Sequence, residues 1–220
     1  MEEVDGRLQA AVASQLVAWR EALASGAARV GWKLGVGDAE RIGREIAVGH
    51  LTSASLVAPG SSFAADPADL LHADAEVAVR LGRDLAPDGN ESAARAAIAG
   101  YGVALEIVDL SDAERGAETV VAGNIFHRAV SFGRFRTEPP AHEAEGRLLV
   151  NGTTRITGPL PVDVIERVRA AARVLSAVGE QLRAGDLVIT GSVVQVAVDR
   201  GDEVVAEIGS LGSVGLVISR

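Results

Sequence analysis

The sequence predicts an α+β protein, and the order of its strand-like and helix-like segments carries this prediction. Strand-like segments outnumber helix-like ones, and the helices fall between clusters of strands rather than alternating with them. Strict alternation would instead favour a doubly wound parallel sheet. Apolar residues make up 48% of the 220 residues, which is enough for a core. We expect a single domain over 1–220, with a helical N-terminal region over 1–60 and a β-rich core over 61–220.

The N-terminal region begins with an amphipathic helix that Gly26 is placed to end. Its apolar face consists of Leu8, Val12, Leu16, Trp19 and Leu23. A short strand over residues 29–35 follows, and the stretch 38–45 is expected to be helical. A Pro-Gly turn at 59–60 then leads into the next unit.

The middle of the chain alternates strands with turns and one short helix. Polar and apolar side chains alternate over 73–81, which predicts a strand. An alanine-rich helix over 92–99 and a second strand over 103–110 follow. Residues 124–133 fit either a strand or an irregular loop.

The last third of the chain carries the strongest hairpin signal, an Asn-Gly pair at 151–152 that favours a type I′ turn. Asp163 and Glu166 form a capping-box pattern, which predicts a helix that ends near Gly179. The remaining predicted strands are separated by glycine-bearing turns and cover 187–190, 193–198, 203–208 and 214–218.

Composition argues against several classes of protein. The chain has 21 basic and 30 acidic side chains, a net charge of −9, so we expect no nucleic-acid partner. The absence of cysteine excludes disulfides and thiolate sites. The N-terminus lacks the features of a signal peptide, and no apolar run is long enough to span a membrane. These features lead us to expect a cytoplasmic protein with no membrane association.

Lys33 is the only lysine, so the other 20 of the 21 basic residues are arginines. An ammonium group is a compact charge with transferable protons, which a guanidinium does not provide. One lysine could also be a remnant of an arginine-rich composition. The neighbouring Trp32, Gly31 and Gly35 favour a shaped pocket wall.

Three acids form the second candidate site. Asp74 and Glu76 lie two residues apart on a predicted strand, so both project from one face, roughly 7 Å apart at the backbone. Glu106 lies among apolar residues of another predicted strand, where an unpaired acid is costly to bury. Three carboxylates brought together repel unless a cation lies between them, and oxygen ligands suit Mg²⁺, Mn²⁺ or Ca²⁺. A solvated strand face remains the alternative for the Asp-x-Glu pair.

Six motifs occur in a fixed order from about residue 8 to the C-terminus. They are Lys33 in Gly-Trp-Lys-Leu-Gly, Asp74-Ala75-Glu76, the Ala-Leu-Glu-Ile-Val-Asp segment 104–109, the segment 124–133, Ala184-Gly185-Asp186 with Thr190-Gly191-Ser192, and 209–214. Together they resemble the fumarylacetoacetate hydrolase superfamily. The branch is similar to the 2-hydroxypenta-2,4-dienoate (2-keto-4-pentenoate) hydratases and the 4-oxalocrotonate decarboxylases.

The resemblance implies a mixed β-roll in which Asp74, Glu76 and Glu106 hold Mg²⁺ or Mn²⁺. Asp74 departs from the glutamate that is usual in the family. By position, the resemblance implies a catalytic role for Lys33 and places His127 among substrate-contacting residues, where it is a candidate catalytic base or a structural residue. His50 lies beside the position of the missing aspartate and is a candidate catalytic substitute for it. The resemblance implies substrate contacts for Leu34, Asn124 and Ser192.

The implied activity is that of a metal-dependent hydratase, a lyase of aromatic-compound catabolism that adds water to a short unsaturated 2-hydroxy or 2-oxo acid. A 4-oxalocrotonate-type decarboxylase and a C–C bond hydrolase remain open. The resemblance also implies a homo-oligomer and leaves open a complex with another enzyme of the pathway. Ala47 and Val194 replace an aspartate and a threonine of the hydratases. Because both changes remove polar groups from the expected pocket, a non-catalytic partner subunit is a further alternative.

Overall fold

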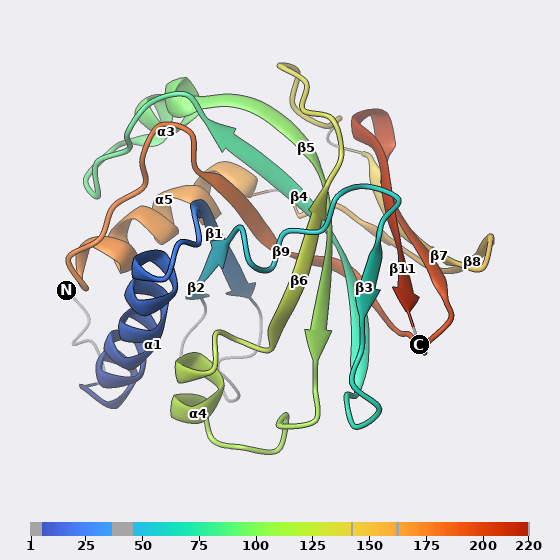
Figure 1. The fold of residues 1–220 in the computed structure, drawn as a ribbon. Coiled ribbons are helices and arrows are strands. Elements are labelled where there is room, and N and C mark those ends of the chain that lie inside the picture. The colour runs from blue at the N-terminus through green and yellow to red at the C-terminus, as the bar shows by residue number, and fades with distance from the viewer. Residues whose placement is uncertain (1–5, 37–45, 142, 162, 220) are drawn as a thin grey trace.

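A computed structural model describes residues 6–36, 46–141, 143–161 and 163–219. Within these ranges the chain forms two curled β-sheets and four α-helices (Figure 1). Each sheet contains both parallel and antiparallel pairs, so the α+β class with mixed sheets is confirmed. The helix expected over 38–45 lies outside the described residues.

The larger sheet has six strands in the order β2-β1-β9-β4-β5-β6. Their bounds are β1 (Arg29–Val36), β2 (Ile46–Thr52), β4 (Leu71–Leu81), β5 (Ile98–Asp109), β6 (His127–Phe132) and β9 (Leu187–Ala197). Strands β1 and β9 run parallel, and the other neighbouring pairs are antiparallel. The long central strands β4, β5 and β9 therefore bring distant parts of the sequence side by side.

The smaller sheet has five strands in the order β3-β11-β10-β7-β8. Their bounds are β3 (Ser62–Ala64), β7 (Glu145–Val150), β8 (Thr153–Pro159), β10 (Glu203–Ile208) and β11 (Gly212–Ser219), with a 3₁₀ turn, η1 (Gly209–Leu211), before β11. The hairpin predicted between β7 and β8 is confirmed, since Asn151 and Gly152 have φ values of 52° and 74°. Positive φ at both central residues is what a type I′ turn requires.

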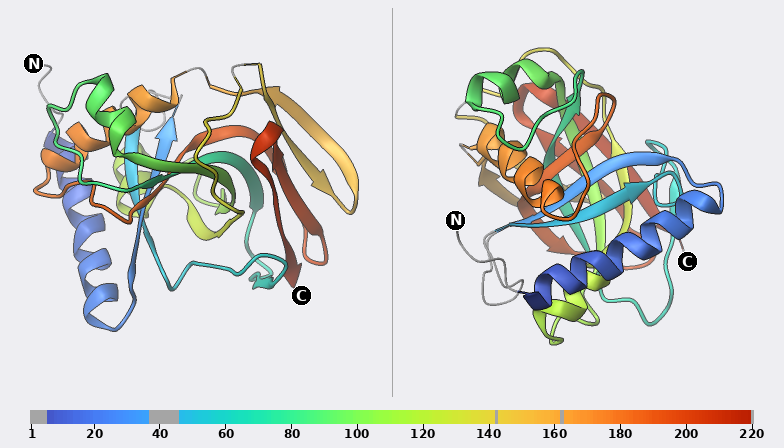
Figure 2. Two further views of the ribbon diagram at one scale, coloured as in Figure 1. Left: turned by 90° about the horizontal axis from the view of Figure 1, so that it is seen from above. Right: turned by 90° about the vertical axis from the view of Figure 1, so that its left-hand side faces the viewer.

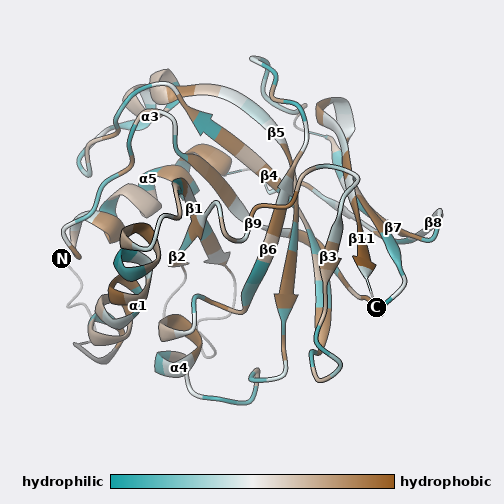
Figure 3. Cartoon of the chain, viewed as in Figure 1, coloured by the Kyte–Doolittle hydropathy of each residue, from teal (hydrophilic) through white to brown (hydrophobic). Residues whose placement is uncertain are grey.

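The four α-helices lie at the opposite end of the molecule from the β7–β8 hairpin (Figures 1 and 2). Their bounds are α1 (Gly6–Ala24), α3 (Glu91–Ala97), α4 (Ala117–Ala122) and α5 (Val164–Ser176). Helices and smaller sheet share one buried core with the larger sheet. Apolar residues gather along strands such as β9 and β11, while loops are more polar (Figure 3). Among the described helices, none combines the length and apolarity needed to cross a membrane.

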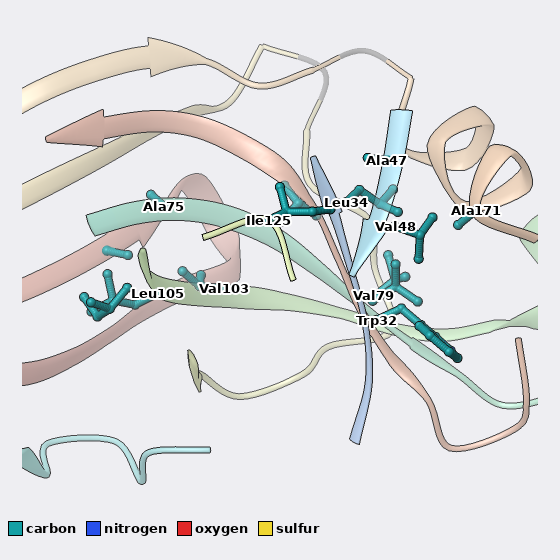
Figure 4. Packing of buried hydrophobic residues seen from close by; sticks show 14 of the residues in the cluster. Trp32, Leu34, Ala47, Val48, Ala75, Val79, Val103, Leu105, Ile125 and Ala171 are labelled. Carbon is teal, nitrogen blue, oxygen red and sulfur yellow. The ribbon is translucent and has the colours of Figure 1, made fainter. Parts of the chain in front are cut away.

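Alternation along β4 separates the two faces of the larger sheet. Ala75 and Val79 belong to the main core, where Figure 4 shows them with residues of other elements. Ala78 belongs to a second, smaller apolar cluster on the other face. Because side chains alternate along a strand, Asp74 and Glu76 share the face of Ala78 and point away from the main core.

Several expected boundaries need correction. The strands expected at 187–190 and 193–198 are parts of one strand, β9. Gly191, with a φ of 98°, lies within this strand and does not form a turn between two strands. Region 1–60 is not simply helical, because β1 and β2 join the larger sheet. Asp163 stands at the N-cap of α5 but makes no capping hydrogen bond, so the capping box does not form. Its carboxylate instead accepts a hydrogen bond from Arg167 Nε at 2.9 Å.

Candidate metal centre

Strands β4 and β5 bring the three predicted acids together. Asp74 lies directly opposite Glu106 in the antiparallel register, so the two side chains share a face. Glu76 lies two residues further along the same face. Ligand atoms of the three carboxylates lie within 4.8 Å of one another. All three side chains are buried, with exposed fractions of 5% for Asp74 and 1% each for Glu76 and Glu106.

Lys33 reaches this cluster from β1. Its side chain is buried, and Nζ lies 2.6 Å from Glu106 Oε1. Nζ also donates a hydrogen bond to the carbonyl oxygen of Ile125 at 2.9 Å. An ammonium group carries three protons, and these two contacts use two of them. The single lysine of the sequence therefore lies at the acid cluster, and within the described residues one of its three donors has no partner.

The charges at this site are unbalanced. With all three carboxylates ionised, they and the one ammonium would sum to −2. Burial, and then the charge of Glu106, raises the pKa of Asp74 to about 7. Burial, together with the charges of Glu106 and Asp74, also raises the pKa of Glu76 well above its usual value. Burial opposes ionisation of Glu106 too, but the charge of Lys33 and the hydrogen bond from His127 outweigh it, so its pKa is lowered.

The donor set fits a hard divalent cation. Carboxylate oxygens are the ligands that Mg²⁺ and Mn²⁺ prefer. A dication would offset two negative charges and relieve the repulsion by Glu106, which after burial is the next cause of the raised pKa of Asp74. Burial lowers the pKa of His127, so its imidazole does not supply the missing positive charge.

The imidazole of His127 contacts the carboxylate of Glu106. Its Nδ1 lies 2.6 Å from Glu106 Oε1, and its Nε2 lies 2.8 Å from Ser55 Oγ. An ionised carboxylate can only accept, so Nδ1 carries the proton. The single proton of the Ser55 hydroxyl lies between two acceptors, His127 Nε2 and the carbonyl oxygen of Thr52, which is 3.2 Å from Oγ. With both ring nitrogens engaged, His127 orients a candidate ligand rather than facing a substrate.

The carboxylates open into a cavity of about 150 Å³. Its polar wall includes Lys33, the three acids, Ser192 and Gln195. Its apolar wall consists of Leu34, Val36, Val108, Leu110, Ile125 and Phe126. A larger cavity of about 420 Å³ lies between α3, α5 and residues 139–141, but the three clustered acids do not line it. The candidate chemistry therefore lies in the smaller cavity.

Gln195 is a site residue that the sequence did not reveal. It lies opposite Asp74 in the β4–β9 pairing and forms a hydrogen bond with that carboxylate. Ser192, a predicted substrate contact, lies opposite Glu76, and its Oγ is 3.2 Å from Asp74 Oδ1. The pairing shifts register on both sides of Glu76, and this shift cannot be read from the spacing of residues.

Asn124 and His50 were also predicted to act at the site, but neither lines the cavity. The amide of Asn124 donates to the carbonyl oxygen of His50 at 3.0 Å and accepts from its backbone N–H at 2.8 Å. Asn124 therefore ties its loop to β2. Burial, and then the charge of His127, lowers the pKa of His50 to about 4. The third predicted contact, Leu34, does line the cavity.

Ala47 and Val194 lie in the main core rather than in the cavity, with exposed fractions of 3% and 7%. Figure 4 shows Ala47 beside Leu34 and Val48. The expectation that these two residues strip polar groups from the pocket therefore needs correction. The residue of β9 that lies opposite Asp74 is the polar Gln195.

The loop that meets Lys33 has an unusual backbone. Asn124, Ile125 and Phe126 have φ values of 62°, 53° and 64° in succession. Left-handed backbone is uncommon outside glycine and is an outlier for a β-branched residue such as isoleucine. This conformation presents the Ile125 carbonyl to Lys33, while Ile125 and Phe126 line the cavity. Such backbone is concentrated at functional sites.

The chain belongs to the fumarylacetoacetate hydrolase family. The Fumarylacetoacetate (FAA) hydrolase C-terminal family matches residues 35–218. No curated protein matches the chain by sequence.

Solved structures share the fold. One is 4-oxalocrotonate decarboxylase from Pseudomonas putida G7, complexed with magnesium and adipate. It has a TM-score of 0.85 and 23% identity, over 94% of this chain and 84% of that one. Another is fumarylpyruvate hydrolase from Pseudomonas aeruginosa, in complex with Mn²⁺ and pyruvate. It has a TM-score of 0.68 and 21% identity, over 88% of this chain and 91% of that one.

Proposed function

We propose that this chain is a divalent-metal-dependent lyase that adds water to a short unsaturated 2-hydroxy or 2-oxo acid, as a 2-hydroxypenta-2,4-dienoate hydratase does. The observation that carries the proposal is the cluster of three buried carboxylates and one buried lysine at the wall of a small cavity. Asp74, Glu76 and Glu106 would hold Mg²⁺ or Mn²⁺. The bound ion would supply the positive charge that stabilises an enolate oxygen of the substrate.

Lys33 is the proposed acid of the reaction. Its ammonium group lines the cavity, and Glu106 and the Ile125 carbonyl fix its position. It can stabilise a developing oxyanion or transfer a proton to a substrate carbon, which arginine does poorly. Ser192 and Gln195 add a hydroxyl and an amide at the same wall, where they can orient a substrate carboxylate or a water molecule.

The shape of the cavity supports a small substrate. Its volume of about 150 Å³ is below the roughly 300–1,000 Å³ of sites for drug-sized ligands. The apolar wall suits the hydrocarbon end of an unsaturated acid and keeps water from the reacting carbons. Among the described lining residues, Lys33 is the one cationic side chain, so the cavity provides a single positive charge of its own.

Decarboxylation of a 4-oxalocrotonate-type acid is the second candidate. The described residues that line the cavity include no histidine, and both ring nitrogens of His127 are engaged. Loss of CO₂ requires no base to activate water, and Lys33 could protonate the resulting carbanion. The fold shared with 4-oxalocrotonate decarboxylase is compatible with this alternative.

Assays with two substrates separate these functions. We would supply the purified chain with Mg²⁺ or Mn²⁺ and follow the absorbance of 2-hydroxypenta-2,4-dienoate. Metal-dependent loss of absorbance with formation of a 4-hydroxy-2-oxo acid would support the hydratase. Release of CO₂ from 4-oxalocrotonate would select the decarboxylase. A protein that binds Mn²⁺ but converts neither acid would contradict both and favour a C–C hydrolase or a non-catalytic subunit.

We further propose that the chain works in the cytoplasm as a homo-oligomer, alone or with another enzyme of the pathway. Light scattering on the eluting protein measures its mass in solution. A mass of one chain, 22.6 kDa, at assay concentration would contradict the homo-oligomer.

A further inference from the structure

A single peptide group connects helix α5 to the candidate metal centre. Arg167 Nη1 donates a hydrogen bond to the carbonyl oxygen of Thr190 at 2.8 Å. The backbone N–H of Gly191 donates to Glu76 Oε2 at 2.7 Å. The carbonyl of Thr190 and the N–H of Gly191 belong to the same planar peptide group. The guanidinium and the carboxylate are therefore bound to opposite ends of one dipole.

This peptide group is withdrawn from regular strand pairing. The register between β4 and β9 shifts between Glu76 and Ala78, and Gly191 has a φ of 98°. The hydroxyl of Thr190 donates to the carbonyl oxygen of Val77 at 2.9 Å. This backbone carbonyl of β4 is therefore satisfied by a side-chain donor. The irregularity leaves the N–H of Gly191 free to bind a side chain.

The side chains of Val36 and Arg167 fill the space next to the Cα atom of Gly191. A Cβ atom built there would lie 2.7 Å from Val36 Cγ2 and 3.1 Å from Arg167 Nη1. Only glycine combines this φ with so close an approach. The tight packing fixes the peptide between the guanidinium and the metal centre.

Arg167 is itself held in place. Its side chain has an exposed fraction of 15%, and its Nε donates to Asp163 Oδ1, one helical turn earlier, at 2.9 Å. Arg173, further along α5, is more exposed at 48% and binds Glu166. Of these two arginines, Arg167 is the one bonded to β9.

We propose that Arg167 is a positioning residue for the metal centre, which acts through the Thr190–Gly191 peptide to hold Glu76. A cation at the carbonyl end polarises the peptide and strengthens its N–H as a donor. The N–H then fixes one oxygen of Glu76, so that the carboxylate would be held in position to bind an ion. The inference rests on the metal centre proposed above and is independent of which acid the enzyme converts.

Mn²⁺ binding to the metal-free protein tests this role without any turnover. Titration calorimetry would compare the wild type with Arg167→Met, which keeps an apolar stem but loses the charge and the donors. Partners behind metal ligands are typically worth about 10–100-fold in affinity, and we expect a loss of that size. Arg173→Met is the matched control on the same helix and should leave Mn²⁺ affinity unchanged. Arg167→Lys keeps a cation near the carbonyl and should recover part of the loss.

Unchanged Mn²⁺ affinity in Arg167→Met, or an equal loss in Arg173→Met, would overturn the proposal. Circular dichroism and thermal midpoints establish that each variant is folded. If Arg167→Met does not fold, Arg167→Gln takes its place with the same expected loss. A wild type that binds no Mn²⁺ would remove the metal centre and this role with it. Normal Mn²⁺ binding without conversion of either acid would contradict only the proposed reaction.

Discussion

Strand β1 contributes to two buried clusters of charge, which differ in the number of cations and donors available to each carboxylate. Asp186, with an exposed fraction of 4%, accepts hydrogen bonds from Arg29 Nε at 2.7 Å and from Arg29 Nη2 at 2.6 Å. It also accepts from Trp32 Nε1 at 3.2 Å and from the backbone N–H of Arg183 at 2.9 Å. One carboxylate thus has four donors. At the metal centre, three carboxylates have further hydrogen bonds but share the charge of one lysine.

The difference distinguishes a structural carboxylate from a functional one. Asp186 is saturated by its donors, and Arg29 also lies over the rings of Trp19 and Trp32, at 5.6 and 5.1 Å from their centroids. Asp74 keeps an excess of negative charge around it, and its pKa is raised to about 7. Strongly perturbed acids in a cavity indicate a functional site. Successive residues of β1 serve the two clusters, since Trp32 contacts Asp186 and Lys33 contacts Glu106.

The largest expected effect is on metal binding. Glu106→Gln removes one candidate ligand charge while keeping the size of the side chain. We expect Mn²⁺ affinity to fall by more than the ~100-fold that partners behind ligands cost, and metal-dependent activity to be abolished. Circular dichroism should show an intact fold. Retained activity in this variant would count against the site.

The second effect is on stability. Asp186→Asn removes the nearer charge partner of Arg29 and leaves Glu180, at 4.0 Å from Nη1, and we expect a loss of about 3 kcal/mol in the free energy of unfolding. Urea unfolding measures this loss. Mn²⁺ affinity should be unchanged, so this variant and Glu106→Gln control each other. A stable Asp186→Asn protein that had lost Mn²⁺ binding would break the distinction between the two clusters.

The third effect is on turnover. Lys33→Arg keeps the positive charge but replaces an ammonium that can give up a proton. General acid–base groups contribute about 10²–10⁴-fold, so we expect kcat to fall by about 100-fold with metal binding retained. Steady-state kinetics at saturating Mn²⁺ measures this. Wild-type rates would show that the lone lysine is an accident of composition.

The smallest effect is a pH dependence of Mn²⁺ affinity. Because the pKa of Asp74 is about 7 in the metal-free protein, a proton occupies this carboxyl below neutral pH and competes with the ion. Affinity should therefore rise with pH through this range, by roughly tenfold per pH unit for each proton displaced, and the raised pKa of Glu76 acts in the same direction. Calorimetry in buffers of different ionisation enthalpy counts the protons released. Affinity that does not change between pH 5.5 and 7.5 would contradict the raised pKa.

Local sequence features predicted much of the fold. The Asn151-Gly152 turn depends on neighbouring residues alone and occurs as expected. Gly191 was expected to end a strand but lies within β9. Whether a glycine makes a turn or a bulge depends on the register of the adjacent strand, which one segment does not encode.

The residues of the candidate site that could be predicted from the sequence are those whose type itself indicates the chemistry. Glu106 is unusual enough among its apolar neighbours to be singled out, and β5 places it opposite Asp74. Gln195 could not be found, because it reaches Asp74 only through the shifted β4–β9 pairing. Asn124 carries a polar group suited to a substrate, yet its amide bonds to the backbone of β2.

The most direct test is a crystal structure of the protein grown with Mn²⁺ and oxalate, with anomalous scattering used to locate the ion. We predict one strong Mn²⁺ peak between the carboxylates of Asp74, Glu76 and Glu106, with oxalate on its open side near Lys33. No Mn²⁺ between these acids, or Mn²⁺ bound only elsewhere, would contradict the metal centre.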